Sequence, residues 1–238
     1  GVILRPLSLI RLSHIENEIG MKINKIKFKY IIRGVINMTF MLFIPIILTV
    51  LPALIYQVVM LFFNKKSTTS HYLWTFIMMI YVYLVFSVTG IGSIWEMISK
   101  GGLITTLQQA NISFIPFQSD GVFTYIMNVI MLMPLGFLLP YIWKNFRNPI
   151  KVALTGLVFS MLIEFSQLPT NRLVDIDDLM MNVLGTIFGF VVWKVIERHF
   201  FNRNEEKRTV SLGNLEPVIY LLLAWACNFL LYNWEWFV

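Results

Sequence analysis

Six apolar segments, each close to the length of a membrane-spanning helix, decide what this chain can fold into. They are residues 35–63, 71–91, 122–143, 150–168, 178–196 and 216–236. A helix needs about 20 mainly apolar residues to cross the hydrocarbon core of a bilayer. Irregular backbone and open sheet edges are excluded there, because their polar groups would lack hydrogen-bond partners. The sequence therefore predicts an all-α fold, a polytopic transmembrane helical bundle of about six hydrophobic segments.

Composition and charge argue against a soluble protein. Only 13% of the residues are charged and 57% are hydrophobic, whereas soluble domains carry about 25% charged residues. The net charge of +6 comes from basic residues beside the apolar segments, so it predicts membrane orientation and no nucleic-acid partner. The single cysteine, Cys227, excludes an internal disulfide. Because the three histidines all flank apolar segments, we predict no metal site and no cofactor.

The loops rich in Lys and Arg orient the segments. These residues are Lys65 and Lys66; Lys144, Arg147 and Lys151; and Lys194, Arg198, Arg203, Lys207 and Arg208. Such loops are retained in the cytoplasm, which places the connections 92–121 and 169–177 outside. The longer of the two is predicted to carry a surface helix from Trp95 to Leu107.

The first segment leaves two topologies open. Residues 35–63 would extend about 44 Å as a straight helix, which exceeds a hydrocarbon core of about 30 Å. Pro45 and Pro52 lie inside the segment, and proline breaks or kinks helices. One alternative is a re-entrant helical hairpin with both ends in the cytoplasm. The other is a single tilted, kinked span that begins outside and is preceded by an interfacial basic helix.

Polar side chains collect on single faces of two neighbouring segments. On 150–168 and just beyond it, they are Ser160, Glu164, Gln167 and Asn171, spaced four, three and four apart. On the next segment they are Asp175, Asp178 and Asn182, followed at the same spacing by Gly185 and Gly189. Such spacing places residues on one side of a helix, and glycines four residues apart allow another helix to approach closely. Ionisable groups near hydrocarbon are costly and indicate a functional site.

The helical rise brings these residues to one level of the membrane, near the outer surface. Arg172, in the short outer connection, is close enough to pair with the neighbouring carboxylates. Asp177 falls off the polar face and is interpreted as a carboxylate at a helix N-terminus. The predicted ligand-binding residues are Asn128, Glu164, Gln167, Arg172, Asp175, Asp178 and Asn182.

Two interpretations of this cluster remain open. It could be a structural network of amides, carboxylates and one arginine that joins helices. Four carboxylates against Arg172 alone favour a second interpretation, in which the site takes a cation or a cationic or polyhydroxylated ligand. Desolvation could instead keep one carboxyl group protonated.

Four stretches, in this order and spacing, resemble the VanZ-like proteins of Gram-positive bacteria over residues 71–196. They are NISFIPF at 111–117, NVIMLMPLGFLLP at 128–140, SMLIEFSQ at 160–167 and RLVDIDDLMMNVLGTIFG at 172–189. The resemblance implies a multi-pass protein of the bacterial plasma membrane with a role in low-level resistance to lipoglycopeptides such as teicoplanin. It implies no established catalytic residues.

The resemblance divides the chain into four parts. Residues 1–34 are a basic N-terminal or interfacial segment, and 35–70 an additional hydrophobic segment. Residues 71–196 form the VanZ-like membrane domain. Residues 197–238 are a cytoplasmic linker followed by an extra transmembrane helix.

The favoured function is a non-enzymatic envelope protein whose outer-leaflet pocket engages a lipid headgroup, a lipid-linked wall precursor or the lipoglycopeptide. The alternative is an intramembrane hydrolase or transferase, with Glu164 as general base, Asp175 and Asp178 on Mg²⁺ and Arg172 on phosphate. No histidine accompanies these acids and no nucleophile lies beside a base, which argues against catalysis. A lipid transporter is a third possibility, and a homo-oligomer is left open.

Overall fold

Helices make up nearly all of the computed structural model, which describes residues 7–110, 112–113, 115–117, 121–170, 174–200 and 211–233. The helices are α1 (Leu7–Phe62), α2 (Thr69–Thr89), α3 (Ile94–Ser99), α4 (Leu103–Gln109), α5 (Val122–Ile142), α6 (Pro149–Gln167), α7 (Ile176–Phe200) and α8 (Glu216–Leu231). Two short 3-10 turns cover Lys144–Phe146 and Leu168–Thr170, and two strands of two residues are β1 (Ile112–Ser113) and β2 (Val174–Asp175). Residues 44–233 form one compact unit, and the earlier part of α1 belongs to a separate unit.

Five helical segments within the described residues are long and apolar enough to cross a membrane. They are Lys27–Phe62, Thr69–Ser99, Val122–Ile142, Pro149–Thr170 and Ile176–His199. The sixth predicted segment contains α8, a shorter apolar helix of 16 residues. The prediction of an all-α polytopic bundle is confirmed.

The first segment contains no hairpin. Helix α1 continues through Pro45 and Pro52 to Phe62, so the re-entrant alternative is wrong. A proline inside a helix lacks one backbone N–H donor. In the turn after Pro45, the Thr49 hydroxyl donates to the Pro45 carbonyl at 2.7 Å, and it accepts from the Asn228 amide of α8 at 2.9 Å. This contact joins α8 to the part of α1 that lies within the compact unit.

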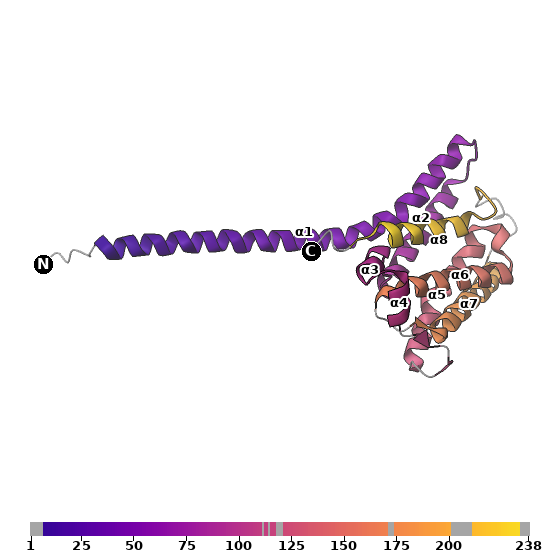
Figure 1. Cartoon of the computed structure of the whole chain (residues 1–238). Helices are drawn as coiled ribbons and strands as arrows, with labels where there is room; N and C mark the ends of the chain where they lie inside the picture. The colour runs from indigo at the N-terminus through magenta and orange to yellow at the C-terminus, as the bar shows by residue number, and fades with distance from the viewer. Residues whose placement is uncertain are drawn as a thin grey trace. The chain divides into compact units, whose positions relative to one another are not determined.

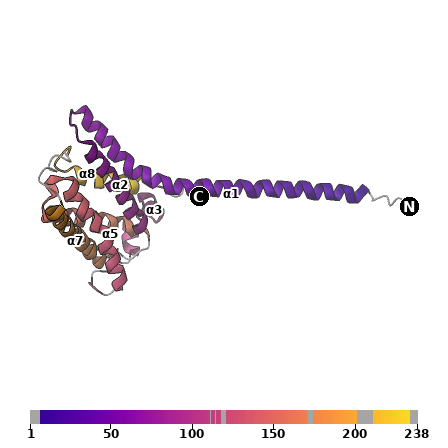
Figure 2. The same cartoon turned by 180° about the vertical axis from the view of Figure 1, so that it is seen from behind.

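Helices α5 and α7 pack along each other (Figures 1 and 2), and glycines bring their backbones together. A Cβ atom added at Gly185 would lie 2.2 Å from the carbonyl oxygen of Val129, and one at Gly189 would lie 1.9 Å from that of Met133. From the other side, a Cβ at Gly136 would lie 1.8 Å from the Thr186 carbonyl. The predicted close approach of another helix to the glycine pair of α7 is thereby confirmed.

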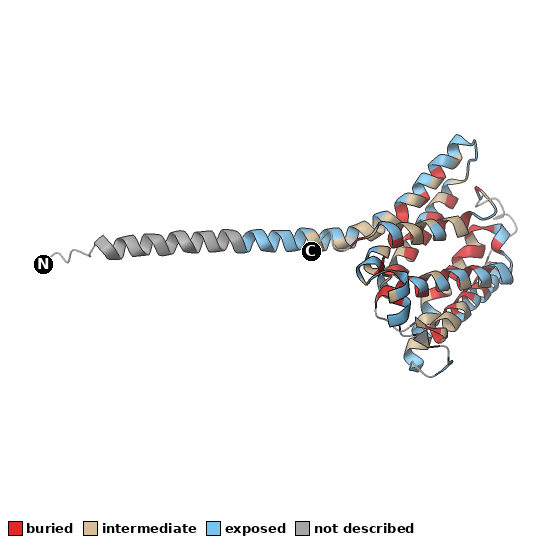
Figure 3. Ribbon diagram, in the orientation of Figure 1, coloured by how far each residue is buried: buried red, intermediate tan, exposed pale blue. Residues whose placement is uncertain are grey.

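The remaining helices of the compact unit cover this pair, and its buried residues, red in Figure 3, lie where helices face one another. Helix α6 packs on α7, where Gly156 leaves room for the side chain of Thr186. Helix α2 contacts α5 through Tyr81, whose hydroxyl donates to the Met131 carbonyl at 2.7 Å. Helix α8 contacts α6 through Trp225, whose indole N–H donates to the Leu162 carbonyl at 3.0 Å.

The surface helix predicted from Trp95 to Leu107 is broken in two. Helix α3 ends at Ser99 and α4 begins at Leu103. Between them, Gly101 and Gly102 have φ angles of +94° and +92°, which a right-handed helix cannot contain and which glycine adopts at little cost. The prediction that this connection is helical is right, but the prediction of one continuous helix is wrong.

A buried polar cluster joins α2, α5 and α8 at their adjoining ends. His71, which the sequence places at the edge of a segment, is fully buried and lies 2.8 Å from Glu216 (Nε2 to Oε1). The Glu216 carboxylate also accepts from Trp143 Nε1 at 2.9 Å, the Tyr220 hydroxyl at 2.8 Å and the Leu212 N–H at 2.7 Å. Since buried polar groups need partners, this cluster fixes the start of α8 in the bundle.

Candidate functional site

The opposite end of the bundle gathers most of the polar residues singled out in the sequence. The N-terminal half of α5, the C-terminal half of α6 and the N-terminal half of α7 meet there. Asn128 of α5 donates its amide to the Asp178 carboxylate of α7. Asn182 of α7 donates to the Ser160 hydroxyl of α6 at 2.9 Å. Polar residues that were predicted to lie at one depth in the membrane therefore contact one another directly.

Asp175 fixes the start of α7. Its Oδ1 atom accepts from the backbone N–H of Asp177 at 3.0 Å, which is the contact of an N-cap residue with a free N–H of the first helical turn. A short parallel pairing of Ile112 with Val174 and of Ser113 with Asp175 holds the preceding backbone. Only 2% of Asp175 is exposed, so the cap is also a buried carboxylate.

Asp177 takes part in the site, although the candidate set derived from the sequence left it out. It is fully buried, and its carboxylate accepts from the Phe117 N–H at 2.8 Å and from the Tyr125 hydroxyl at 2.9 Å. Its position in the first turn of α7 also suits a negative charge. The acidic first turn was visible in the sequence, but the partners of Asp177 are 60 and 52 residues away and no spacing reveals them.

Glu164 lies on the face of α6 that is turned towards α7. Its side chain is buried, it accepts a hydrogen bond from the backbone N–H of Asp175, and the charges of Asp178 and Asp175 are close enough to act on it. The three carboxylates thus occupy one region, as the helical spacing predicted. Each of them interacts unfavourably with the other two when all are charged.

Three buried acceptor oxygens of this region have no hydrogen-bond donor in the part of the chain that the structure describes. They are Glu164 Oε2, Asp175 Oδ2 and Asn182 Oδ1. The exposed fractions of these residues are 7%, 2% and 2%. An acceptor buried without a donor costs about 1–3 kcal/mol, and such groups in folded proteins call for a specific explanation.

One member of the predicted set contacts another helix, and one lies outside the described residues. Gln167 points its amide to α2, where Nε2 donates to the Thr89 carbonyl at 2.8 Å. It therefore joins two helices. Arg172 lies outside the described residues.

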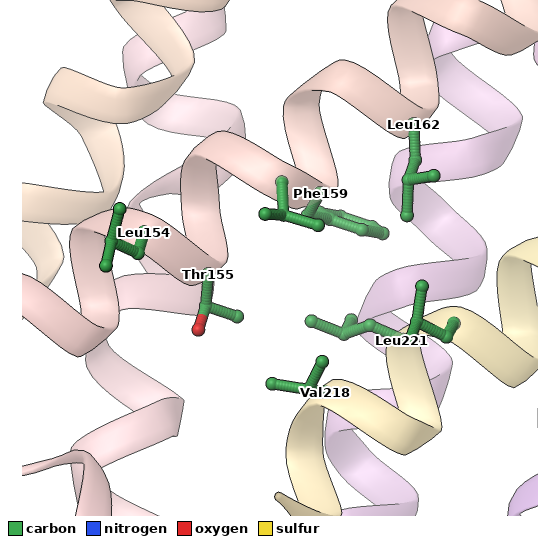
Figure 4. Close-up of a pocket in the computed structure, with 8 residues that line it drawn as sticks. Leu154, Thr155, Phe159, Leu162, Val218 and Leu221 are labelled. Carbon is green, nitrogen blue, oxygen red and sulfur yellow. The ribbon is translucent and has the colours of Figure 1, made fainter.

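Two apolar cavities lie elsewhere in the compact unit. One, of about 190 Å³, is formed by side chains of α6 and α8 that face each other, including Leu154, Phe159 and Leu221 (Figure 4). The other, of about 460 Å³, lies between α1 and α8 and is lined by residues that include Pro52 and Cys227. The first opens on the face of α6 opposite to Glu164. Among the described residues, no group of three or more His, Cys, Asp or Glu side chains could hold a metal ion.

Comparison with known proteins gives one match. The family model described as VanZ/LLP1 matches residues 49–197, which is more than half of the 238 residues. No curated protein and no solved structure shows significant similarity to the chain. The match spans the helices that carry the polar site, from α5 to α7, and the sequence motifs noted above lie within it. The chain is a membrane protein that belongs to the VanZ/LLP1 family.

Proposed function

We propose that this protein supports resistance of the bacterial cell envelope to lipoglycopeptides of the teicoplanin type by binding a ligand at the acidic site. The ligand is a lipid headgroup, a lipid-linked wall precursor or the drug itself. The protein acts in the plasma membrane, with the site in the outer leaflet, as the basic loops predict.

The observation that carries the proposal is the set of three buried acceptor oxygens without donors. A purely structural network in a membrane is expected to satisfy most of its members, because an unmatched polar group in hydrocarbon is costly. The cluster around Glu216 leaves one such atom, His71 Nδ1, and the acidic site leaves three. Here Asn128 and Ser160 are used in helix contacts, while Glu164, Asp175 and Asn182 each keep an oxygen available. Binding capacity that the fold does not use supports a ligand.

Drug susceptibility of a host that expresses the protein tests the proposal. The parent chain should raise the inhibitory concentration of teicoplanin more than that of vancomycin, since only the former carries an acyl chain that enters the membrane. Glu164→Gln and Asp178→Asn should abolish this protection at unchanged membrane levels. Glu197→Gln, which makes the same change on the cytoplasmic part of α7, is the matched control and should protect like the parent.

The outcomes separate the site from the rest of the molecule. Protection retained in both site variants would make the cluster structural and would refute the proposed role of the pocket. Absence of protection from the parent chain itself would refute the resistance role.

A further inference from the structure

We infer that the chemical group recognised by the acidic site is a primary ammonium group. The inference rests on the proposed function, because it names the chemistry of the ligand for the same site. It follows from which atoms of the site are already bonded and which are left over.

The donors of the site are used within the fold. The Asn182 amide donates to Ser160, the Asn128 amide to Asp178 and the Tyr125 hydroxyl to Asp177. The backbone N–H groups of Asp177 and Phe117 are bonded to carboxylate oxygens as well. Each of these five donors thus already serves an acceptor of the protein.

The leftover atoms are all acceptors. Glu164 Oε2, Asp175 Oδ2 and Asn182 Oδ1 come from α6, from the cap of α7 and from α7 itself. A primary ammonium group has three N–H donors and no acceptor, so its donors equal the leftover oxygens in number. A hydroxyl group offers one donor and would leave two of the oxygens unmatched.

Charge leads to the same group. Two of the three oxygens belong to carboxylates, those of Glu164 and Asp175. A phosphate or another anion would bring further acceptors and negative charge to these oxygens. A cation that donates hydrogen bonds supplies charge compensation and donors together, and charge-assisted hydrogen bonds are the stronger kind.

Size and burial favour an ammonium at the end of a narrow stem. The three oxygens are fully buried, and neither of the two cavities described above is lined by the residues that carry them. An –NH₃⁺ group is close to a water molecule in size, whereas a trimethylammonium group is wider and carries no N–H. The site should therefore accept ethanolamine-like amines and reject choline-like ones.

Binding of matched probe pairs to the full-length purified protein tests this inference. The lipid pair is dioleoyl-phosphatidylethanolamine and dioleoyl-phosphatidylcholine in nanodiscs or mixed micelles, and the soluble pair is ethanolamine and choline. Occupancy is measured by native mass spectrometry. The primary amine should bind about tenfold tighter or more, because its quaternary counterpart leaves the acceptors unmatched.

Glu164→Gln should remove the preference, since the glutamine amide brings its own donor and no charge, while Glu197→Gln should keep it. A preference seen with both pairs indicates that a free amine suffices, and one seen with lipids alone identifies a headgroup; both support the inference. Equal binding of the two members of each pair to the parent overturns it, as does a preference that survives Glu164→Gln or is displaced by Mg²⁺ alone. The comparison within the parent chain stands even if a variant fails to fold.

The inference and the proposed function can fail separately. Drug protection that depends on Glu164, without any preference for primary amines, would keep the site and overturn the ammonium. A preference for primary amines without an effect on drug susceptibility would support the ammonium and refute the resistance role.

Discussion

The buried acidic residues that the structure describes are of two kinds. In some, both carboxylate oxygens accept hydrogen bonds, and in others one oxygen has no donor. Glu216 accepts four hydrogen bonds, and Asp177 accepts from a backbone N–H and a hydroxyl. Glu164 and Asp175 each keep an oxygen that no described donor reaches. A carboxylate whose oxygens all accept hydrogen bonds has its burial compensated within the fold, and removing a partner is strongly destabilising. A carboxylate with an unmatched oxygen lowers stability until something binds to it.

Glu216→Gln tests the first kind. The glutamine amide would point donor hydrogens at groups that are themselves donors, and His71 would lose its charged partner. Breaking a buried pair in this way typically costs about 3–5 kcal/mol, so the melting temperature in detergent should fall sharply. The half-exposed pair of Arg147 and Glu197, 3.1 Å apart, provides the contrast, because Glu197→Gln should cost less than about 1 kcal/mol. Similar losses in both variants would contradict the structural role of Glu216.

Asp177→Asn tests how far the contacts of Asp177 with Phe117 and Tyr125 stabilise the site. The asparagine keeps one acceptor oxygen and turns an amide N–H towards donors, so a loss of about 1–3 kcal/mol is expected. Tyr125→Phe removes only the hydroxyl contact and should cost about 1 kcal/mol. Thermal unfolding of the purified variants measures both losses. If Tyr125→Phe were the more damaging change, the Phe117 N–H contact would not be the stronger restraint on Asp177.

At the scale of elements, the close contact between α5 and α7 depends on glycines, because a side chain at these positions would meet the backbone of the other helix. Gly189→Ala would place a methyl group where the Met133 carbonyl lies, 1.9 Å away. Backbone cannot move aside like a side chain, so a cost above about 2 kcal/mol is expected. Gly213→Ala, whose Cβ would meet Tyr56 at an ordinary 3.7 Å, is the control. A Gly189→Ala protein as stable as the control would show that the two helices are further apart than described.

The same elements explain which features the sequence could predict. Helical periodicity placed Glu164, Asp178 and Asn182 together correctly, because residues spaced three and four apart share a face whatever surrounds them. It did not reveal that the Gln167 amide donates to Thr89 of α2, because a position on that face says nothing of the neighbour it meets. The contacts of Asp177 with Phe117 and of His71 with Glu216 join residues far apart in the chain. Tertiary packing alone brings such pairs together, so local patterns could not predict them.

Across the whole compact unit, the two polar clusters lie at opposite ends of the helices. His71, Trp143 and Glu216 belong to the end where α2 and α8 begin and α5 finishes, next to the basic loops. Glu164, Asp175 and Asp178 belong to the other end. The proposed function requires the second end to face outward, since a drug or wall precursor arrives from that side. Orientation is therefore the property on which the proposal for the molecule depends.

Accessibility of single cysteines in intact cells decides that orientation. In a Cys227→Ala background, Ile115→Cys lies next to the site and Asn145→Cys lies between α5 and α6, both at exposed positions. Because the loops rich in Lys and Arg are retained in the cytoplasm, a membrane-impermeant maleimide should label Ile115→Cys directly and Asn145→Cys only after permeabilisation. The reverse pattern would turn the acidic site towards the cytoplasm. A lipoglycopeptide could then not reach it from outside, and any ammonium ligand would have to come from the inner leaflet or the cytosol.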